Sequence, residues 1–228
     1  RHVLGDVALH TGHAVQRLQR DSQGWYLVLE GGLSTGPFDQ VMLALPPAQA
    51  AVLLAGHQDG WADELVARRM HACWTLMAVT NDVDWPWDAA DIDRGPLARV
   101  VRNDRKPGRQ PQMGQAHWVA HATPAWSAAH LEADPLEIAQ SLGTALAALL
   151  PAGPLRWHHR AAHRWRYAVP AEAPQDSRDC LFDGDTGLGV CGDFFGAGDV
   201  ESAWRSGDEL ADTVCAWLEQ EEPVAEPA

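Results

Sequence analysis

The sequence is poor in positive charge, in cysteine and in long apolar runs. Its 17 Lys and Arg residues stand against 31 Asp and Glu residues, which gives a net charge of −14. Nucleic-acid binding rests largely on Lys and Arg that neutralise phosphates, and anionic membranes attract basic segments in the same way, so both are excluded as general partners. No run approaches the ~18 apolar residues of a membrane span, and no signal peptide is visible, so we expect a cytoplasmic protein.

The cysteines and histidines do not form a recognisable metal or disulfide pattern. The four cysteines, none of which share a CxxC spacing, are Cys73, Cys180, Cys191 and Cys215. We interpret them as small apolar side chains in a reducing compartment, with disulfide or metal pairing as the alternative. His159 and His163 have the i, i+4 spacing of a helical metal pair, but they are not part of an HExxH pattern. The alternation of Trp165 and Tyr167 favours a strand, so we predict no metal site.

Apolar patterning predicts a mixed α/β fold. Alternating runs separated by Gly-containing turns predict a β-meander over residues 13–45, with FDQVMLAL at 38–45 as its third strand. Prolines and capping residues predict three helix starts, at Pro47, after Asp59 and at Asp134-Pro135. Further strands are expected in CWTLMAVT, LARVVRND and AHWVAHAT and over residues 155–170.

One segment combines elements that suit ligand binding. Residues 187–192 form a short apolar strand, Asp193 stands at its carboxyl end, and a Gly-rich turn leads to a helix that Asp199 caps and Val200 begins. A carboxylate there can accept hydrogen bonds from a sugar or ribityl hydroxyl, and a helix N-terminus with about half a positive charge can stabilise an anion. The same arrangement is common in α/β proteins that bind nothing there, so both interpretations stay open at this point. The helix is expected to have an apolar stripe of Val200, Ala203, Gly207, Leu210, Val214 and Trp217 or Leu218.

The segment GDFFGAGDVESAWRSG, residues 192–207, resembles the C-terminal flavin motif of the FAD-dependent amine oxidase superfamily. Four further stretches, in order along the chain, resemble the bacterial renalase-like proteins of that superfamily: DQVMLALPPAQAAVLL at 39–54, DRKPGR at 104–109, HWVAHATPAWSAAHLE at 117–132 and HRWRYAVP at 163–170. The resemblance implies a two-domain α/β (α+β) flavoprotein fold, in which a mixed-sheet substrate domain is inserted into the FAD domain. The implied boundaries are residues 1–46 and 176–220 for the FAD domain, 47–175 for the inserted domain and 221–228 for an acidic tail.

The resemblance also implies which residues meet the cofactor and the substrate. The implied FAD contacts are Asp193, Val200, Glu201 and Ala203, with Gly192 shaping the turn, Val15 meeting the adenine through its backbone and Ala44 in the segment that crosses near the dinucleotide. Trp165 and Arg166 match an aromatic–basic segment that faces the substrate side of the flavin.

A basic turn, RNDRKPGRQPQ at 102–112, stands out in this acidic chain. One interpretation is a solvated hairpin tip. The other is a positively charged lip over an anionic ligand. In that second interpretation Arg105 and Lys106, together with Arg102 and Arg109, attract the phosphates of a dinucleotide substrate.

One part of the family pattern is not present. Members of the superfamily open with a strand, a GxGxxG turn and a helix, and the glycines of this sequence do not form that fingerprint. The sequence therefore resembles the C-terminal two-thirds of a flavoprotein, in which FAD binding is weakened and the FAD-domain sheet exposes an edge suited to self-association.

By this resemblance the expected function is that of an FAD-dependent oxidoreductase. Hydride passes from a dihydronicotinamide-type or amine substrate to flavin N5, and oxygen is the acceptor. The alternative is a flavin-free fragment that acts only as a binding or oligomerisation module.

Overall fold

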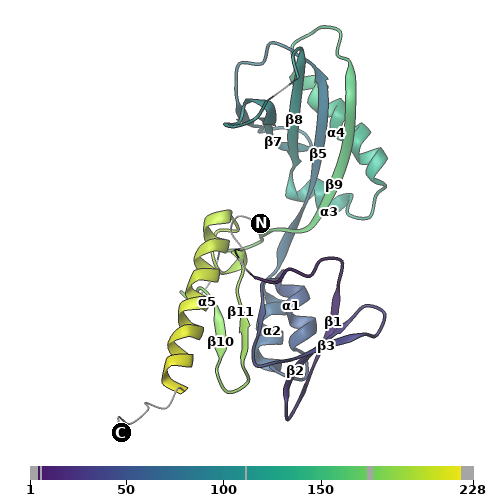
Figure 1. Cartoon of the computed structure of the whole chain (residues 1–228). Coiled ribbons are helices and arrows are strands. Elements are labelled where there is room, and N and C mark those ends of the chain that lie inside the picture. The colour runs from purple at the N-terminus through teal and green to yellow at the C-terminus, as the bar shows by residue number, and fades with distance from the viewer. Residues whose placement is uncertain (1–4, 6, 111, 174–176, 222–228) are drawn as a thin grey trace. The chain divides into compact units, whose positions relative to one another are not determined.

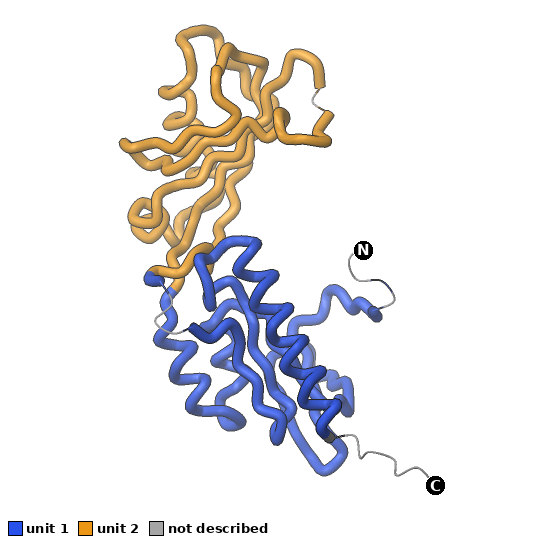
Figure 2. The backbone as a smooth tube through the Cα atoms, turned by 90° about the vertical axis from the view of Figure 1, so that its left-hand side faces the viewer, with its two compact units in different colours: residues 1–69, 172–228 blue, residues 70–171 orange. Residues whose placement is uncertain are grey.

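The computed structural model describes residues 5, 7–110, 112–173 and 177–221. The chain folds into two compact units, which Figure 2 shows in different colours. Unit 1 comprises Arg1–Arg69 and Glu172–Ala228, and unit 2 comprises Met70–Ala171. Both units contain helices and strands, so the fold is mixed α/β. No helix in the described ranges is long and apolar enough to cross a membrane.

Unit 1 contains two three-stranded sheets (Figure 1). The first is an antiparallel meander of β1 (Val15–Asp21), β2 (Gly24–Leu29) and β3 (Ser34–Phe38). The second has the order β10-β11-β4 and consists of β10 (Leu181–Asp183), β11 (Leu188–Val190) and β4 (Val41–Leu43). β10 is antiparallel to β11, and β4 is parallel to it.

The third strand of the meander is not the one that the sequence predicted. The run at 38–45 supplies only the last residue of β3, and its apolar part forms β4 in the other sheet. Gly36 allows the preceding Gly- and Pro-containing segment to pair with β2, because a Cβ at Gly36 would lie 2.5 Å from the carbonyl oxygen of Trp25. Because glycine permits this close approach of the two backbones, residues that the sequence indicated as a turn form the strand β3.

Two helices follow β4. α1 (Pro47–Leu54) begins at the predicted proline. α2 (Asp59–Ala67) has Gln58 as its N-cap, so the prediction that Asp59 caps it is wrong. The Asp59 carboxylate instead accepts a hydrogen bond from the Gly56 N–H at 2.7 Å, which closes the turn between the helices.

Both helices belong to unit 1, whereas the sequence placed residues 47–175 in the inserted domain. His57, between the helices, shows why. Its Nε2 lies 3.1 Å from the Leu18 carbonyl oxygen in β1, and its ring meets the Trp25 ring edge-on at 4.9 Å. The helix pair is thus tied to the meander, and the inserted unit is the shorter stretch Met70–Ala171.

The chain ends its described part with η2 (Asp193–Phe195) and α5 (Val200–Glu221). α5 packs on the second sheet through Leu210, which is buried, whereas Val200 is 87% exposed. The inward stripe also contains Ser206, because its hydroxyl accepts a hydrogen bond from Gly192 N–H at 2.9 Å. The predicted apolar stripe is therefore wrong at its first two positions, Val200 and Ala203, which are both exposed. Of the predicted tail at 221–228, only residue 221 lies within the described residues.

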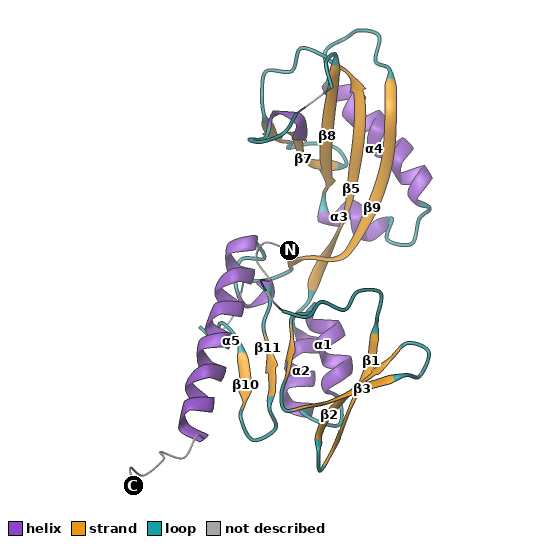
Figure 3. Cartoon of the chain, in the orientation of Figure 1, coloured by secondary structure: helices purple, strands orange, loops and turns teal. Residues whose placement is uncertain are grey.

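Unit 2 is built on one antiparallel sheet with the order β6-β7-β8-β5-β9. Its strands are β5 (Met70–Asn81), β6 (Ala89–Asp91), β7 (Leu97–Arg102), β8 (Gln115–Ala122) and β9 (Trp157–Pro170). The short helix η1 (Asn103–Arg105) follows β7, and α3 (Pro124–Ala129) and α4 (Pro135–Leu149) follow β8 (Figure 3).

α4 covers one face of this sheet. Asp134 caps it through its Oδ1, which accepts hydrogen bonds from Leu136 N–H at 2.8 Å and Glu137 N–H at 3.4 Å, as the sequence predicted. Every second residue of β5 and β8 then points at the helix. The resulting core contains Trp74, Leu76, Ala78, Trp118, Ala120, Ile138, Leu142 and Leu146. α3 packs on the same face, because its Trp126 packs against this core, and Ser127 Oγ accepts a hydrogen bond from Trp74 N–H at 3.0 Å.

The segment at 155–170 forms a strand, as predicted, rather than a helix. On a strand, His159 and His163 lie about 13 Å apart along the chain direction, too far for two ligands of one ion. In the ranges that the structure describes, no group of three or more His, Cys, Asp or Glu side chains could hold a metal ion.

Candidate functional site

The carboxyl ends of β4 and β11 lie side by side in unit 1. The strands are parallel, Leu43 is the register partner of Val190, and Cys191 N–H donates a hydrogen bond to the Leu43 carbonyl at 3.0 Å. Ala44 therefore follows β4 at the same edge of the sheet where Gly192 follows β11. This is the edge at which open α/β sheets bind ligands.

Gly192 ends β11 in a turn that has no room for a side chain. A Cβ at Gly192 would lie 2.3 Å from a ring carbon of Phe194. Phe194 and Phe195 are buried against each other, with ring centroids 4.7 Å apart. The two aromatic rings thus fix the chain directly below the turn.

Asp193 holds the turn through its backbone and leaves its carboxylate as an acceptor. Its carbonyl oxygen accepts hydrogen bonds from Gly196 N–H at 3.0 Å and Gly198 N–H at 3.1 Å. Burial raises the pKa of the Asp193 carboxyl, and the nearby Asp199 charge adds to this, while a hydrogen bond from Phe194 N–H opposes it. A partly desolvated carboxylate gains from hydroxyl donors that replace the lost water.

Asp199 caps α5, as predicted. Its carboxylate accepts hydrogen bonds from Ser202 N–H at 2.8 Å and from Ser202 Oγ at 2.6 Å. The N–H groups of Val200 and Glu201 have no acceptor among the described residues. Both residues are exposed, as is Ala203, which follows Ser202 in the same helix. The helix therefore presents donor groups and its positive dipole end to solvent.

The residues predicted to meet FAD fall into two groups in the structure. Ala44, Gly192 and Asp193 share one edge of the second sheet, and the first turn of α5 follows that edge after the Gly-rich turn. Val15 lies elsewhere in unit 1, as the first residue of β1, where it pairs with Leu29.

Trp165 and Arg166 point to opposite faces of the unit 2 sheet. Trp165 is 54% exposed and meets His163 edge-on, on the face away from α4. Arg166 shares Glu132 with Arg164, donating to its carboxylate at 2.8 and 3.2 Å. Because successive strand residues alternate in direction, the two side chains point to opposite faces and do not serve one ligand together.

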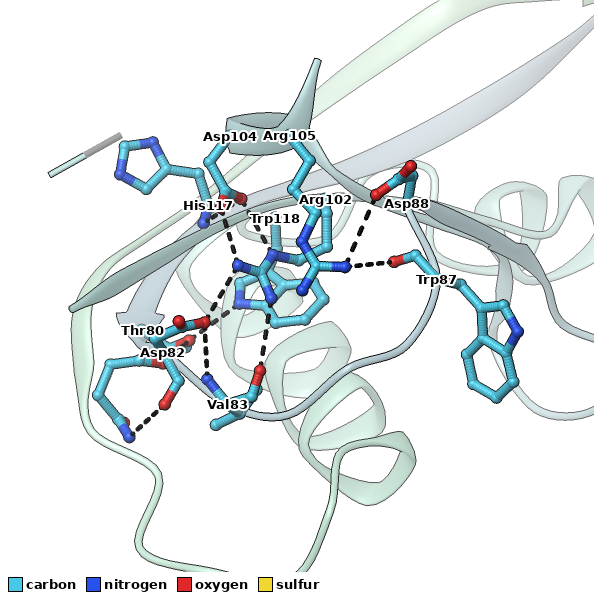
Figure 4. A network of polar contacts seen from close by, with 11 residues as sticks. Thr80, Asp82, Val83, Trp87, Asp88, Arg102, Asp104, Arg105, His117 and Trp118 are labelled. Atoms are coloured by element: carbon cyan, nitrogen blue, oxygen red, sulfur yellow. Dashed lines mark hydrogen bonds and ion pairs between the residues drawn. The ribbon is translucent and has the colours of Figure 1, made fainter. Parts of the chain in front are cut away.

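The basic residues of the turn at 102–112 also differ in their surroundings, because one is buried and three are exposed. Arg102 is only 2% exposed and donates two hydrogen bonds to Asp104, at 3.0 and 2.8 Å, and one to Asp82 at 3.1 Å (Figure 4). Its guanidinium also lies 4.9 Å from the Trp118 ring centroid. The expectation that Arg102 attracts phosphates is therefore wrong, since its charge is already neutralised inside the unit.

The other three basic residues of the turn, Arg105, Lys106 and Arg109, are exposed. Arg105 lies 3.6 Å from an Asp88 oxygen and donates a long hydrogen bond of 3.5 Å to the Trp87 carbonyl (Figure 4). Lys106 acts on another group, because its positive charge contributes to lowering the pKa of His121 in β8.

His121 and Thr75 are polar residues that the sequence analysis did not single out. They are register partners on the sheet face away from α4, and Thr75 Oγ1 lies 3.0 Å from His121 Nδ1. The spacing of His117, Val119 and His121 at every second position of a strand was the available signal. It places both histidines on one face.

Several solved structures are similar to this chain. The chain is similar to a putative protoporphyrinogen oxidase from Exiguobacterium sp. 255-15, with a TM-score of 0.69 and 15% identity over 91% of this chain and 47% of that chain. It is similar to a putrescine oxidase bound to putrescine, with a TM-score of 0.58 and 15% identity over 94% of this chain and 51% of that chain. It is also similar to the cyclohexylamine oxidase from Brevibacterium oxydans IH-35A, with a TM-score of 0.59 and 16% identity over 90% of this chain and 48% of that chain.

No protein-family model matches the chain. At such low identity the likeness to solved structures concerns the fold. The fold is that of parts of two-domain FAD-binding oxidoreductases, and the chain spans about half the length of the proteins that it matches. The expected fold class is thereby confirmed.

Proposed function

We propose that this chain is the part of an FAD-dependent oxidoreductase that holds the isoalloxazine and ribityl end of the cofactor. One observation carries the proposal: Ala44, Gly192 and Asp193 meet at the carboxyl edge of β4 and β11, next to the first turn of α5. The similarity in fold to the two amine oxidases named above supports it.

The residues present at this edge fit the cofactor. The Asp193 carboxylate, whose pKa is raised by burial, is an acceptor for ribityl hydroxyls. The N–H groups of Val200 and Glu201, without acceptors in the described part of the chain, suit the oxygen of a flavin that gains negative charge on reduction. The absence of a side chain at Gly192 lets a flat ring approach the backbone.

When bound, FAD supplies the hydride acceptor for the reaction. The residues of this chain then orient the ring and stabilise the charge that develops on it. In the finer form of the proposal the protein is renalase-like, the donor is a dihydronicotinamide-type compound or an amine, and oxygen is the final acceptor. Arg105 and Lys106 would attract an anionic donor.

The proposal is tested by titrating FAD into the purified chain and following the visible flavin absorbance of the protein fraction after gel filtration. We expect bound flavin in the wild type. We expect about tenfold weaker binding in Asp193→Ala, because a charge-assisted hydrogen bond to a ligand contributes about 1.5–3 kcal/mol.

Asp212→Asn is the matched control, since Asp212 lies on the exposed side of α5, far along the helix from its first turn. It should bind FAD as the wild type does. A wild-type chain that stays colourless with excess FAD contradicts the proposal and favours the alternative of a flavin-free binding or oligomerisation module.

A further inference from the structure

Two cysteines of unit 1 stand opposite each other at one end of the β10–β11 hairpin. The last register pair of the hairpin toward this end is Leu181 with Val190. One further step along the same register brings Cys180, directly before β10, opposite Cys191, directly after β11. Both are free thiols, and both are partly buried.

Ser206 of α5 fixes the chain just beyond the two cysteines. Its hydroxyl donates a hydrogen bond to the Asp179 carbonyl and accepts one from Gly192 N–H at 2.9 Å. Asp179 and Gly192 are the next pair of the same register, so the serine bridges them where the two strands separate. The cysteines are therefore held from both sides, by a register pair on one side and by this bridge on the other.

The hydrogen bonds of β11 show which kind of pair the cysteines form. Cys191 N–H donates to the Leu43 carbonyl at 3.0 Å, and β4 lies on the opposite side of β11 from β10. The backbone of Cys191 thus bonds away from Cys180, which makes the two a non-hydrogen-bonded pair. Such pairs have Cα atoms about 4.5 Å apart. Cysteines joined by a disulfide have Cα atoms about 4.4–6.8 Å apart, so the backbone already has a suitable spacing.

Both thiols lie on the face of the hairpin that α5 covers (Figure 1). A Cβ at Gly189, two residues before Cys191, would lie 2.9 Å from Leu210 of α5. Side chains two residues apart on a strand share a face, so Cys191 points toward α5 as well. Cys180 has Thr213 of α5 as a hydrogen-bond partner. Opposed residues of an antiparallel pair share a face, so the two sulfurs are neighbours.

Burial raises the pKa of both thiols. At Cys180 the hydrogen bond with Thr213 opposes this rise. The negative charges of Glu209 and Asp179 add to it. Because the thiolate is the reactive form, the two cysteines react slowly near pH 7 and faster as the pH rises. The presence of a second sulfur opposite the first, rather than a low pKa, is what distinguishes this pair.

We propose that Cys180 and Cys191 are a redox modification site, which hydrogen peroxide closes into a disulfide between β10 and β11. One thiolate attacks a peroxide oxygen, the O–O bond breaks, and the sulfur becomes a sulfenic acid as the first water leaves. The second thiol attacks that sulfur, the S–O bond breaks, and the second water leaves as the disulfide forms. Two thiols and one peroxide thus give one disulfide and two waters, and two electrons pass from sulfur to oxygen. A dithiol reverses the change by thiol–disulfide exchange.

The disulfide ties the end of β11 to the start of β10, directly before the turn of Gly192 and Asp193. It encloses only the short hairpin, so it stabilises unit 1 by restricting the opening of that end. It also protects the two sulfurs from the irreversible sulfinic and sulfonic acids. Closure needs a peroxide but no bound flavin.

The test is treatment of the folded, flavin-free chain with hydrogen peroxide at about pH 8.5, where more thiolate is present, followed by iodoacetamide and tryptic mass spectrometry. Both cysteines fall in one tryptic peptide, residues 179–205, because no Lys or Arg precedes Arg205 within it. We expect this peptide to carry no alkyl group and to be lighter by two hydrogens. After dithiothreitol it should take up two alkyl groups. The urea midpoint of the chain should rise on closure and return on reduction.

Cys73 is a matched control within the same chain. It is also a partly buried thiol with a raised pKa, but its register partner is Trp165 rather than a cysteine. It should form no disulfide under the same treatment. Cys215→Ser removes the exposed thiol of α5 and should leave closure unchanged. Cys180→Ser and Cys191→Ser should each abolish both the closure and the rise in the urea midpoint.

Three results overturn the inference. The first is a peptide 179–205 that still takes up two alkyl groups after peroxide treatment of the folded chain. The second is a disulfide that joins either cysteine to Cys73 or Cys215. The third is oxygen added to the two sulfurs without a bond between them. Because no flavin is present, failure here leaves the FAD titration of the proposed function unaffected.

Discussion

At the scale of single residues, two glycines of unit 1 differ in whether the structure requires the absence of a side chain. Gly187, just before β11, has a φ of +69°, and a Cβ there would lie 2.7 Å from the Asp39 carbonyl oxygen. Gly207 lies inside α5, and a Cβ there would meet nothing within 4 Å. The first glycine allows β11 to start against the segment before β4, and the second has no such role.

We predict that Gly187→Ala lowers the free energy of unfolding by about 2–4 kcal/mol, because the left-handed conformation and the contact with backbone both penalise a Cβ. Gly207→Ala should raise it by about 1 kcal/mol, because alanine is the better helix former. Urea denaturation measures both. A neutral Gly187→Ala would mean that the two backbones do not approach so closely.

Arg102 and Asp104 form the other decisive pair of residues. Burial opposes ionisation of Asp104, but hydrogen bonds from Arg102 and from His117 N–H outweigh it and hold the pKa of the carboxyl below its ordinary value. A group with a lowered folded pKa contributes stability above the unfolded pKa, about 3.9 for Asp, and loses that contribution as the pH falls through the folded value.

Asp104→Asn should therefore cost about 3 kcal/mol or more at pH 7, because it leaves the buried Arg102 charge poorly compensated. It should also flatten the fall in stability of the wild type below pH 4. Denaturation curves at several pH values measure both effects. Asp91→Asn, at an exposed ion pair with Arg99, should change stability by less than about 1 kcal/mol. Equal losses of stability in Asp104→Asn and Asp91→Asn would contradict the prediction that the buried pair contributes more than the exposed one.

At the scale of elements, β4 is the unprotected part of unit 1. It ends the order β10-β11-β4, so its outer edge has no strand partner among the described residues. Met42 at its centre is 36% exposed. Edges of this kind are templates for pairing with another chain. This is the physical basis for the expected self-association.

Met42→Lys should reduce self-association of the chain, because a charged side chain on an edge strand disfavours pairing. Sedimentation velocity over a range of concentrations is the measurement. Met113→Lys adds the same charge in a fully exposed loop and should leave the sedimentation unchanged. If the wild type is monomeric at every concentration, the edge is not used for self-association.

Whether an element depends on neighbouring or on distant residues explains which sequence predictions are confirmed. The capped start of α4 at Asp134, the start of α1 at Pro47 and the strand at 155–170 depend on neighbouring residues, and all are confirmed. The pairing of β4 with β11 depends on residues about 150 positions apart, and no local pattern contains it. The burial of Arg102 escaped prediction for the same reason, since Asp82, just after β5, and Trp118 of β8 reach it from other parts of the chain.

At the scale of the whole molecule, the charge is unevenly distributed between the units. Unit 2 has nearly equal numbers of acidic and basic residues, so unit 1 carries the entire net negative charge of the chain. This contrast is invisible in the overall composition and appears only once the units are known.

The register pair Met70 and Pro170 has a consequence for how such a chain can be rearranged. Unit 2 starts on β5 and finishes on β9, and these two strands are hydrogen-bonded neighbours over most of their length. In connectivity, unit 2 is a single insertion in the chain of unit 1, and its first and last strands are paired with each other. Its two ends leave from adjacent points, so exchanging it for another module with adjacent ends, or closing the gap with a short turn, requires no displacement of α2 and β10, the elements that flank it.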